Sequence, residues 1–471
     1  MKKNLLLLVI IGSTLTAMSQ NISRYNKNRI QPWMENPRFW QYKGKPVMLL
    51  GASDDDNLFQ WEKEILIPHL TEMQKSGVNY LRNTMSGRED KGFEIQAFLK
   101  TDEGRYDLNQ WNDAYWTRLN TFLKETAKRN MIVQIELWDR FDYSQQHWQH
   151  NPYNPKNNIN YTSKESGLNE HYPDHPGSNK QPFFFTTPKQ RNNTTLLTVQ
   201  ERYIEKLLSN TLQYGNVLYC IDNETSGEEN WAIYWRDFIT TAAQKKGKEI
   251  CVTEMWDDWN LLSPTHKRTF DYPQRYQFVE LSQNTHQIGK ELWNNLSWVA
   301  NYIDESPRPM NIVKTYGSDY GKHGSTSQAI ERWWLHLLGG VAAVRFHRPD
   351  SGLGFSALSA ASVKAARKLE DIVNYWDLKA DNQFLINSNT SPAYLSYKPD
   401  EVYLIFLPNG GSTKLKMNDY QHTGSINYLN LRSGEWLLRK PGEITLGSEL
   451  KITAPDNNQW VVVINRIKKR K

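Results

Sequence analysis

The sequence predicts an α/β fold, a (β/α)8 TIM barrel followed by a small antiparallel β-sandwich domain. Two observations predict it. Between residues 39 and 378, eight short apolar segments alternate with segments of helical spacing, and eight such units close a parallel sheet into a barrel. From about Asn387 the pattern changes to short alternating strands separated by Gly, Pro and Asn turns, which is typical of a sandwich.

The eight strand-like segments are short and rich in Val, Ile and Leu. They lie within residues 39–53, where a short hairpin leads into the first strand, and within 79–86, 131–141, 216–225, 249–258, 276–284, 310–318 and 339–349. The helix after the second strand shows the expected period, with Trp116, Leu119, Leu123 and Ala127 on one face. Strands that alternate with such helices are typical of a parallel sheet.

One connection is unusually long. Residues 151–193, after the third strand, are rich in Asn, Pro, His and Tyr and show no periodicity. A loop of this length inside a domain is usually functional or disordered. Because it follows the C-terminal end of a barrel strand, we expect a loop on the catalytic rim that contacts substrate.

The N-terminus predicts export. Residues 1–19 combine Lys2 and Lys3 with an apolar centre and a small-residue end, which indicates a signal peptide cleaved between Ser19 and Gln20. The apolar stretch is too short for a membrane span, and no other stretch is apolar enough. We therefore expect a secreted or periplasmic protein with a barrel over 20–385 and a β-sandwich over 386–471.

Charge and cysteine content exclude several classes of protein. The net charge is +6, but seven of the 57 basic residues lie in the signal segment or between Arg466 and Lys471, which leaves 50 basic against 51 acidic residues. A body with a balance of −1 does not favour a nucleic-acid partner. Cys220 and Cys251 are too few for a disulfide framework, and we expect buried free thiols.

The candidate site begins at the end of the fourth strand. The run NVLYCIDNET places Asn223 and Glu224 where the strand ends. Catalytic groups of this fold lie at the C-terminal ends of its strands. A carboxyl group there suits the protonation of a departing sugar oxygen, which requires two carboxyl groups in different environments. The alternative for Glu224 is a structural ion pair.

With these segments placed, residues 36–378 resemble clan A glycoside hydrolases. Arg82 and Asn83 close the second strand, the stretch 106–137 is similar to the helix and strand that follow in that clan, and Asn223-Glu224 match its acid/base pair. The C-terminal region resembles the small β-domain, often labelled collagen-binding, that follows the barrel in secreted bacterial glycosidases of the apiosidase-like kind.

The resemblance implies roles for several residues. Arg82 would support a catalytic carboxylate, Glu224 would act as general acid/base, and Asn223 would bind a sugar 2-hydroxyl. The sequence departs from the clan in the seventh strand, where a nucleophilic Glu is expected. That strand ends in KTYGS, residues 314–318, and the next carboxylate is Asp319.

The second carboxylate is therefore sought elsewhere. Glu254, at the end of the fifth strand, is the leading partner because it lies on the strand next to Glu224; Glu280 and Asp319 are the other candidates. Any of them is alternatively a supporting carboxylate beside an arginine. A separation of about 5 Å would give retention and roughly 6.5–9.5 Å inversion, so the stereochemistry stays open.

Arg82 and Asn83 are also predicted to bind substrate, as are other residues at strand ends. Trp138, Trp256 and Tyr316 are candidate sugar platforms, with core aromatics as the alternative. Further lumen-end acids are Glu136, Asp139, Asp222 and Asp257, of which Asp139 is predicted to contact substrate. His347 and Arg348 end the eighth strand and are predicted to bind a substrate hydroxyl or carboxylate, with a strand-end pair packed against the loop as the alternative. Arg348 would suit a uronic acid because a guanidinium binds carboxylates through two hydrogen bonds.

No metal or other cofactor is expected. The run Asp54-Asp55-Asp56 does not reproduce calcium-loop spacing, and a solvated loop is the preferred interpretation. The chain has no G-x-S-x-G elbow, Walker loop, His-Glu-x-x-His or Cys-x-x-Cys motif.

The sequence thus predicts a secreted glycosidase acting on plant- or algal-type polysaccharides or oligosaccharides. Two alternatives stay open: a non-catalytic carbohydrate-binding protein on a decayed barrel, and a polysaccharide lyase. Linkage, endo or exo action, the role of the C-terminal domain and the oligomeric state are not fixed by the sequence.

Overall fold

The computed structural model describes residues 26–88, 91–319, 322–386, 392–416, 422–437, 443–446 and 449–466. The predicted signal segment 1–19 and the basic residues 468–471 lie outside the described residues. Within the described ranges, no helix has the length and apolar character needed to cross a membrane.

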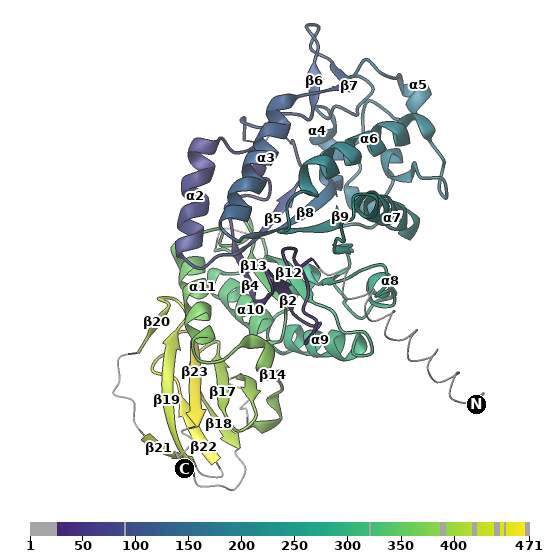
Figure 1. The fold of residues 1–471 in the computed structure, drawn as a ribbon. Coiled ribbons are helices and arrows are strands. Elements are labelled where there is room, and N and C mark those ends of the chain that lie inside the picture. Colours follow the sequence, from purple (N-terminus) through teal and green to yellow (C-terminus); the bar gives the residue numbers. More distant parts are fainter. Residues whose placement is uncertain are drawn as a thin grey trace, which may run out of the picture.

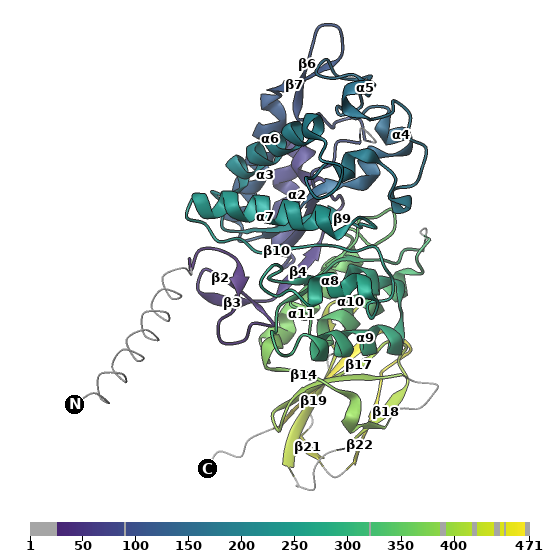
Figure 2. The same cartoon turned by 90° about the vertical axis from the view of Figure 1, so that its right-hand side faces the viewer.

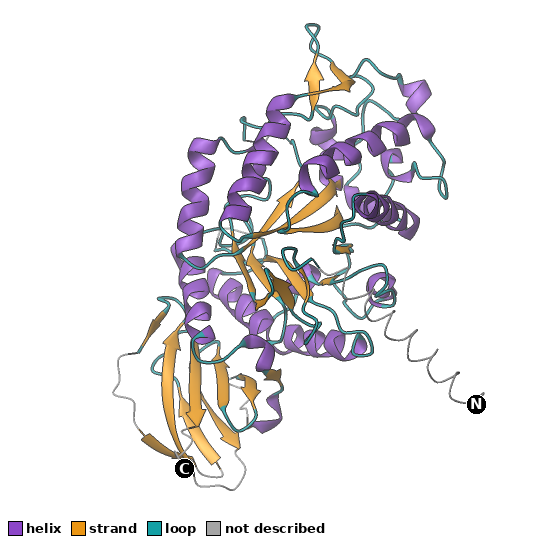
Figure 3. Ribbon diagram, viewed as in Figure 1, coloured by secondary structure: helices purple, strands orange, loops and turns teal. Residues whose placement is uncertain are grey.

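A barrel of eight parallel strands forms the centre of the molecule, as predicted (Figures 1 and 3). In chain order the strands are β4 (Leu49–Ala52), β5 (Tyr80–Thr84), β8 (Ile132–Asp139), β9 (Val217–Asn223), β10 (Val252–Thr253), β11 (Val279–Glu280), β12 (Met310–Thr315) and β13 (Ala343–Phe346). Their spatial order is β10-β9-β8-β5-β4-β13-β12-β11. The barrel nearly closes, because Thr253 Oγ1 donates to the Phe278 carbonyl at 2.8 Å across the remaining seam.

Helices surround these strands on the outside (Figure 3). Each barrel strand is followed by one main helix: α2 (Lys63–Lys75), α3 (Asp113–Lys128), α6 (Thr194–Thr211), α7 (Glu229–Lys245), α8 (Pro264–Phe270), α9 (Gly289–Tyr302), α10 (Thr326–Leu338) and α11 (Ala357–Glu370). Local sequence explains several helix starts. Asn112 and Asn193 cap α3 and α6 with their side chains, and Ser325 and Ser356 open capping boxes at α10 and α11.

Among the described residues, buried polar side chains fill the interior of the barrel below the C-terminal ends of the strands. Gln134 accepts a hydrogen bond from the Tyr80 hydroxyl at 2.6 Å, and it donates to Glu280 at 3.1 Å. Asn311 donates to the same glutamine at 3.2 Å and accepts from the indole of Trp40 at 2.9 Å. Trp40 belongs to the predicted N-terminal hairpin, the small sheet β1 (Gln31–Pro32), β2 (Trp40–Tyr42) and β3 (Lys45–Val47). This polar plug restricts any site to the C-terminal ends of the strands.

The long connection after β8 is compact. It contains η2 (Arg140–Tyr143), α4 (Gln145–Trp148), α5 (Ser163–Ser166), η3 (Pro176–Ser178) and η4 (Pro182–Phe185), and it lies beside the hairpin of β6 (Phe98–Lys100) and β7 (Tyr106–Trp111). Asn154 and Asn158 are buried and donate to backbone carbonyls of the loop, at 2.9–3.1 Å. Buried amides of this kind replace the ladder hydrogen bonds that a loop lacks.

Antiparallel sheets follow the barrel, as predicted. The larger sheet has the order β14-β16-β17-β23-β19-β20, with β21 also paired to β19, and the smaller has the order β15-β18-β22. The strands are β14 (Lys379–Ala380), β15 (Leu385–Ile386), β16 (Tyr394–Lys398), β17 (Val402–Leu407), β18 (Ser412–Lys416), β19 (His422–Asn430), β20 (Glu435–Trp436), β21 (Glu443–Leu446), β22 (Glu449–Thr453) and β23 (Trp460–Arg466).

The central strand β17 of the larger sheet is buried on both faces. Along β17, Leu404 and Phe406 join the core of the barrel, whereas Tyr403 and Ile405 pack toward the smaller sheet. The C-terminal sheets lie against α9, α10 and α11, as Figures 1 and 2 both show. Each of these helices contacts the sheets. The ring of Trp293 on α9 packs against the ring of Tyr394. Gln459 donates a hydrogen bond to the Ser327 carbonyl on α10, and Lys368 on α11 donates one to the Gly434 carbonyl.

Candidate active site

Glu224 directly follows β9 in an unusual backbone conformation. Its φ is +45°, in the left-handed region that residues other than glycine rarely adopt. The turn is fixed by the next residue, since the Thr225 amide donates to the Met255 carbonyl at 2.8 Å and ties the ends of β9 and β10 together. Strain of this type persists where the surroundings impose it, and it is frequent at functional sites.

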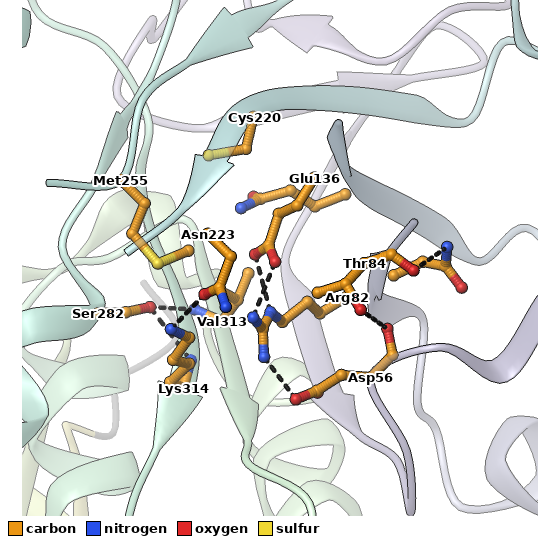
Figure 4. A network of polar contacts seen from close by, with 12 residues as sticks. Asp56, Arg82, Thr84, Glu136, Cys220, Asn223, Met255, Ser282, Val313 and Lys314 are labelled. Atoms are coloured by element: carbon orange, nitrogen blue, oxygen red, sulfur yellow. Dashed lines mark hydrogen bonds and ion pairs between the residues drawn. The ribbon is translucent and has the colours of Figure 1, made fainter. Parts of the chain in front are cut away.

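Lys314 reaches Glu224 from the opposite side of the barrel mouth. Its Nζ lies 2.6 Å from Glu224 Oε1. The same nitrogen donates to Asn223 Oδ1 at 2.7 Å (Figure 4). The Tyr316 hydroxyl and Gln283 Nε2 donate to the same Oε1, at 3.2 and 3.3 Å. Three strand ends, those of β9, β11 and β12, therefore converge on one carboxylate oxygen.

These contacts determine the ionisation of Glu224. Burial by itself would raise the pKa of this carboxyl, but the charge and hydrogen bond of Lys314, with Arg82 and Tyr316, lower the pKa to about 2. Glu224 is consequently ionised at neutral pH. The proton-donor role expected for Glu224 stays a prediction, and the contact with Lys314 favours the charged form of its carboxyl.

The seventh strand carries the lysine instead of a carboxylate. Asp319, the first acid after β12, is exposed, and it accepts a hydrogen bond from the Thr326 amide at 2.8 Å. Asp319 thus binds the first backbone amide of α10, and no contact joins it to Glu224 among the described residues.

Glu254 and Glu280 are not brought to Glu224 either. The Oε1 of Glu254 accepts from the backbone amides of Asp222 and Met255, at 3.0 and 2.8 Å, and its charged neighbours are Asp222 and Arg140. Burial and the charge of Asp222 raise the pKa of Glu254 well above its usual value. Glu280 lies in the polar plug, where burial raises its pKa to about 7. Both carboxyl groups are buried: Glu254 is 1% exposed and Glu280 is 3% exposed.

Asp257 is the acid that the structure places beside Glu224. Its amide donates to the Thr225 carbonyl at 2.9 Å, one residue from Glu224, and its carboxylate lies 3.4 Å from the Ser226 hydroxyl. The residue is exposed at the mouth. Partial burial and the negative charge of Glu224 raise the pKa of Asp257. The sequence indicated Asp257 only as one of several lumen-end acids.

Arg82 is held between two buried acids. It donates to Glu136 through Nε and Nη2, both at 2.8 Å, and pairs with Asp56 through Nη1 (Figure 4). Asp56 also pairs with Arg345 at 2.8 Å and with Arg348 at 3.5 Å. Arg82 thus supports carboxylates, as the resemblance implied, but they are Asp56 and Glu136.

Two of the three residues of the run Asp54–Asp56 are not solvated, which corrects the sequence-based interpretation for Asp55 and Asp56; the Asp54 side chain is 36% exposed. Asp55 and Asp56 are each 2% exposed. Burial would raise the pKa of Asp56, but Arg82, His347 and Arg345 together hold it well below its ordinary value. Within the described part of the chain, no group of three or more His, Cys, Asp or Glu side chains is arranged to hold a metal ion. Cys220 and Cys251 are buried free thiols, as predicted.

Two of the predicted sugar platforms present no open face. Trp138 is 1% exposed and packs against Trp231 and Trp235 of α7, with centroid distances of 5.9 and 5.3 Å. Trp256 is also 1% exposed, and the Arg268 guanidinium lies over its ring. Both rings belong to the core. Near the ends of these strands, side chains no longer alternate regularly between the two faces of the sheet. Tyr316 differs, since its hydroxyl contacts Glu224.

The other predicted substrate residues have internal partners. Asn83 is buried and accepts from the Phe59 amide at 3.3 Å. Asp139, opposite Asn223 in the β8–β9 pairing, pairs with Arg88.

The two residues that end the eighth strand also face acids. His347 lies between Asp56 and Asp350, at 3.8 and 3.7 Å, and burial holds its pKa well below the usual value. Arg348 is half-buried and pairs with Asp350 at 2.9 Å and with Asp56. A guanidinium with two acidic partners is poorly placed to bind a uronate.

Sequence reasoning missed Lys314, Gln283 and the position of Asp257. One signal was present: Lys314 and Tyr316 are two residues apart, and such residues on a strand point to the same face. This spacing places Lys314 on the same face as the predicted substrate residue Tyr316, but it does not identify Glu224 as its partner.

Part of the chain matches a protein family. Residues 97–257 match a domain of unknown function (DUF6298). The matched segment runs from β6 past the end of β10 and includes Glu224 and Asp257. No curated protein matches the chain.

Solved structures with the same fold cover nearly the whole chain. A glycoside hydrolase family 5 protein from Bacteroides vulgatus ATCC 8482 has 12% sequence identity and a TM-score of 0.61, with 93% of this chain and 94% of that chain covered. A structure described as a glycoside hydrolase has 10% identity and a TM-score of 0.61, with 94% of this chain and 98% of that chain covered. At this identity the likeness concerns the fold: the protein is structurally similar to family 5 glycoside hydrolases, the (β/α)8 barrels of clan A.

Proposed function

We propose that this protein is a secreted glycoside hydrolase that cleaves plant- or algal-type polysaccharides or oligosaccharides. The observation that carries the proposal is the pair formed by Glu224 and Asp257 at the barrel mouth. One carboxyl is held ionised by Lys314, and the pKa of the other is raised beside it. Two carboxyl groups whose environments separate their pKa values are what glycosidic cleavage requires.

The proposed roles follow from these environments. Asp257 donates its proton to the glycosidic oxygen as the bond from that oxygen to the anomeric carbon breaks. On the retaining route Glu224 attacks the anomeric carbon as that bond breaks, and a water molecule deprotonated by Asp257 then displaces Glu224 from that carbon, which restores both carboxyl groups. On the inverting route Glu224 removes a proton from the water molecule that attacks the anomeric carbon, and this proton returns to solvent while Asp257 takes one up. The distance between the two carboxyl groups in the substrate complex decides between retention and inversion.

The surroundings of Glu224 suit a carboxylate that acts from one oxygen. Lys314, Tyr316 and Gln283 all contact Oε1, so among the described residues Oε2 is the oxygen directed to substrate or water. Asn223, bound to the same lysine, lies where a sugar hydroxyl would complete its hydrogen bonding. Glu254 is the weaker candidate for the second carboxyl, because two backbone amides and Asp222 enclose it.

A second function is favoured by one observation. Lys314 stands on β12, the strand on which clan A enzymes carry their nucleophile, and it neutralises the remaining glutamate. This arrangement also suits a carbohydrate-binding protein on a barrel without turnover.

The test is product release from a panel of plant and algal polysaccharides and oligosaccharides, for wild type, Glu224→Gln and a control, Asp319→Asn. We expect cleavage by wild type and by the control, and a loss of at least about 10³-fold in Glu224→Gln. Cleavage that survives Glu224→Gln contradicts the site. Binding without cleavage in all three proteins supports the second function, and an unsaturated product that absorbs in the ultraviolet indicates a lyase.

A further inference from the structure

Five aromatic rings form a continuous belt along one side of the mouth. Trp259 stacks on His286 at 4.2 Å between centroids and 18° between planes, and His286 meets Tyr316 edge-on at 5.4 Å. Tyr316 in turn stacks on His323 at 4.5 Å and meets His347 at 4.9 Å. These residues follow β10, β11, β12 and β13 in turn. The belt therefore spans half of the barrel rim.

The belt leads directly to the candidate catalytic carboxylate. Tyr316 lies at its centre and donates its hydroxyl to Glu224. Trp259, at the outer end, is separated from Tyr316 by the single ring of His286. Gln287 donates to the Trp259 carbonyl at 3.3 Å, which fastens the loop after β10 to the loop after β11.

The rings of the belt are uncharged near neutral pH. Burial lowers the pKa of His286 to about 4, and it also lowers the pKa values of His323 and His347. The other half of the mouth is different, because Arg82, Arg88 and Arg348 meet acids there. Charged groups also border the inner part of the belt, since Tyr316 contacts Glu224 and His347 lies between Asp56 and Asp350, whereas its outer end is the stacked pair of Trp259 and His286.

We propose that Trp259, supported by His286, is a stacking platform for a ring of an uncharged saccharide, next to the bond that Glu224 and Asp257 act on. This inference rests on the proposed function and names its substrate class. The C–H face of a neutral pyranose packs on an aromatic ring without the loss of a charge or of a hydrogen bond.

The geometry of Trp259 supports this role. The indole is 58% exposed, although it is large and apolar. One ring face is covered by His286, so the opposite face is the one that a ligand can cover. A ring already held in position loses little conformational entropy when a ligand binds. The sequence did not single out this tryptophan, whereas Trp138 and Trp256 are buried.

The experiment measures saccharide binding in the full chain carrying Glu224→Gln, which prevents turnover. The probes are cellotetraose, mannotetraose and xylotetraose, with tetragalacturonate as the charged comparison, in titration calorimetry. Trp259→Ala is added to this background. The matched control is Trp298→Ala, since Trp298 on α9 also stacks on a neighbouring ring, Tyr302, at 4.8 Å, but is not part of the belt.

We expect at least one neutral tetrasaccharide to bind, and to bind at least tenfold more weakly after Trp259→Ala, which is about 1.4 kcal/mol. Trp259→Phe should restore most of the affinity, and Trp298→Ala should leave it unchanged. Equal affinities in the Trp259→Ala and Trp298→Ala proteins overturn the inference. So does the absence of binding to all three neutral probes, or tighter binding of tetragalacturonate.

Failure of the proposed function is a separate result. If Trp259→Ala weakens binding but wild type cleaves none of the probes, the platform stands and hydrolysis is wrong. If wild type cleaves a neutral probe and Trp259→Ala leaves its KM unchanged, hydrolysis stands and the platform is wrong.

Discussion

Lys314 Nζ lies 2.6 Å from Glu224 Oε1, and this ion pair joins the ends of β12 and β9 across the barrel mouth. The lysine side chain is 2% exposed and that of the glutamate 17% exposed, so water screens the pair weakly. The pair sets the charge state of the candidate active site. Under the proposed function, the proton for a leaving group therefore comes from another carboxyl, that of Asp257.

Replacement of Lys314 by Met should raise the pKa of Glu224 from about 2. A carboxyl whose pKa is depressed by folding adds stability above its unfolded pKa, about 4.3, and this contribution is lost as pH falls toward 2. In Lys314→Met we expect a loss on the order of 3 kcal/mol at pH 7, because a mostly buried carboxylate loses its partner. We also expect the acid limb of kcat/KM to move to higher pH.

Urea unfolding across the pH range and pH–rate profiles check this prediction. The control is Lys290→Met, an exposed lysine on α9, which should change the free energy of unfolding by less than about 0.5 kcal/mol. An unmoved acid limb in Lys314→Met would show that the lysine does not control Glu224.

Asp257→Asn should remove the proton donor. Because the pKa of Asp257 is raised, the wild-type rate should fall as pH rises through that pKa, and the variant should lack this alkaline limb. We expect a loss of about 10²–10⁴-fold on natural glycosides. Aryl glycosides with a good leaving group need no protonation, so the loss on them should be much smaller. Similar losses on both substrate types would contradict the assignment.

The variant Glu254→Gln tests whether the Glu254 carboxyl has a structural or a catalytic role. Folding raises the pKa of Glu254, so the native state binds the proton more tightly, and stability falls as pH rises from about 4 through the folded pKa. The glutamine keeps the oxygen that accepts from the Asp222 and Met255 amides. We expect a gain at pH 8 of at least about 1.4 kcal/mol, the value of one pKa unit, with activity within a few-fold of wild type. Loss of activity in a stable variant would restore Glu254 as a catalytic candidate.

Asp56→Asn should destabilise the barrel through the arginines that it pairs. Asp56 is buried and contacts Arg82, Arg345 and Arg348. Its removal leaves the buried Arg345 without its ion-pair partner, while Arg82 keeps Glu136 and Arg348 keeps Asp350. We expect a loss of about 3–5 kcal/mol in urea unfolding at pH 7. Asp350→Asn, which removes an exposed partner of Arg348, should cost less than about 1 kcal/mol. Equal losses in the two variants would show that burial does not decide the effect.

Local patterns in the chain were sufficient to predict the architecture. The apolar run Val217–Asn223 is a barrel strand, and the spacing of Trp116, Leu119 and Leu123 produces the buried face of α3. The alternation along Val402–Leu407 likewise separates the two faces of β17. Each pattern depends on neighbours a few residues apart, which is why periodicity reveals it.

Side-chain direction at strand ends was decided only by the tertiary structure. Glu254 and Asp257 are three residues apart, yet one is enclosed beside Asp222 and the other opens at the mouth next to Glu224. Trp138 and Trp256 were equally plausible as platforms, but both turn into the core. Where a strand stops, the strict alternation stops with it, so sequence position no longer fixes the face.

The charge state of the site also needed the fold. The sequence located Asn223 and Glu224, because strand ends collect polar residues in any parallel barrel. It did not assign Lys314 as their partner, since that contact joins segments that are far apart in the chain. A pKa depends on distances through space and on burial, and closure of the barrel is what sets both.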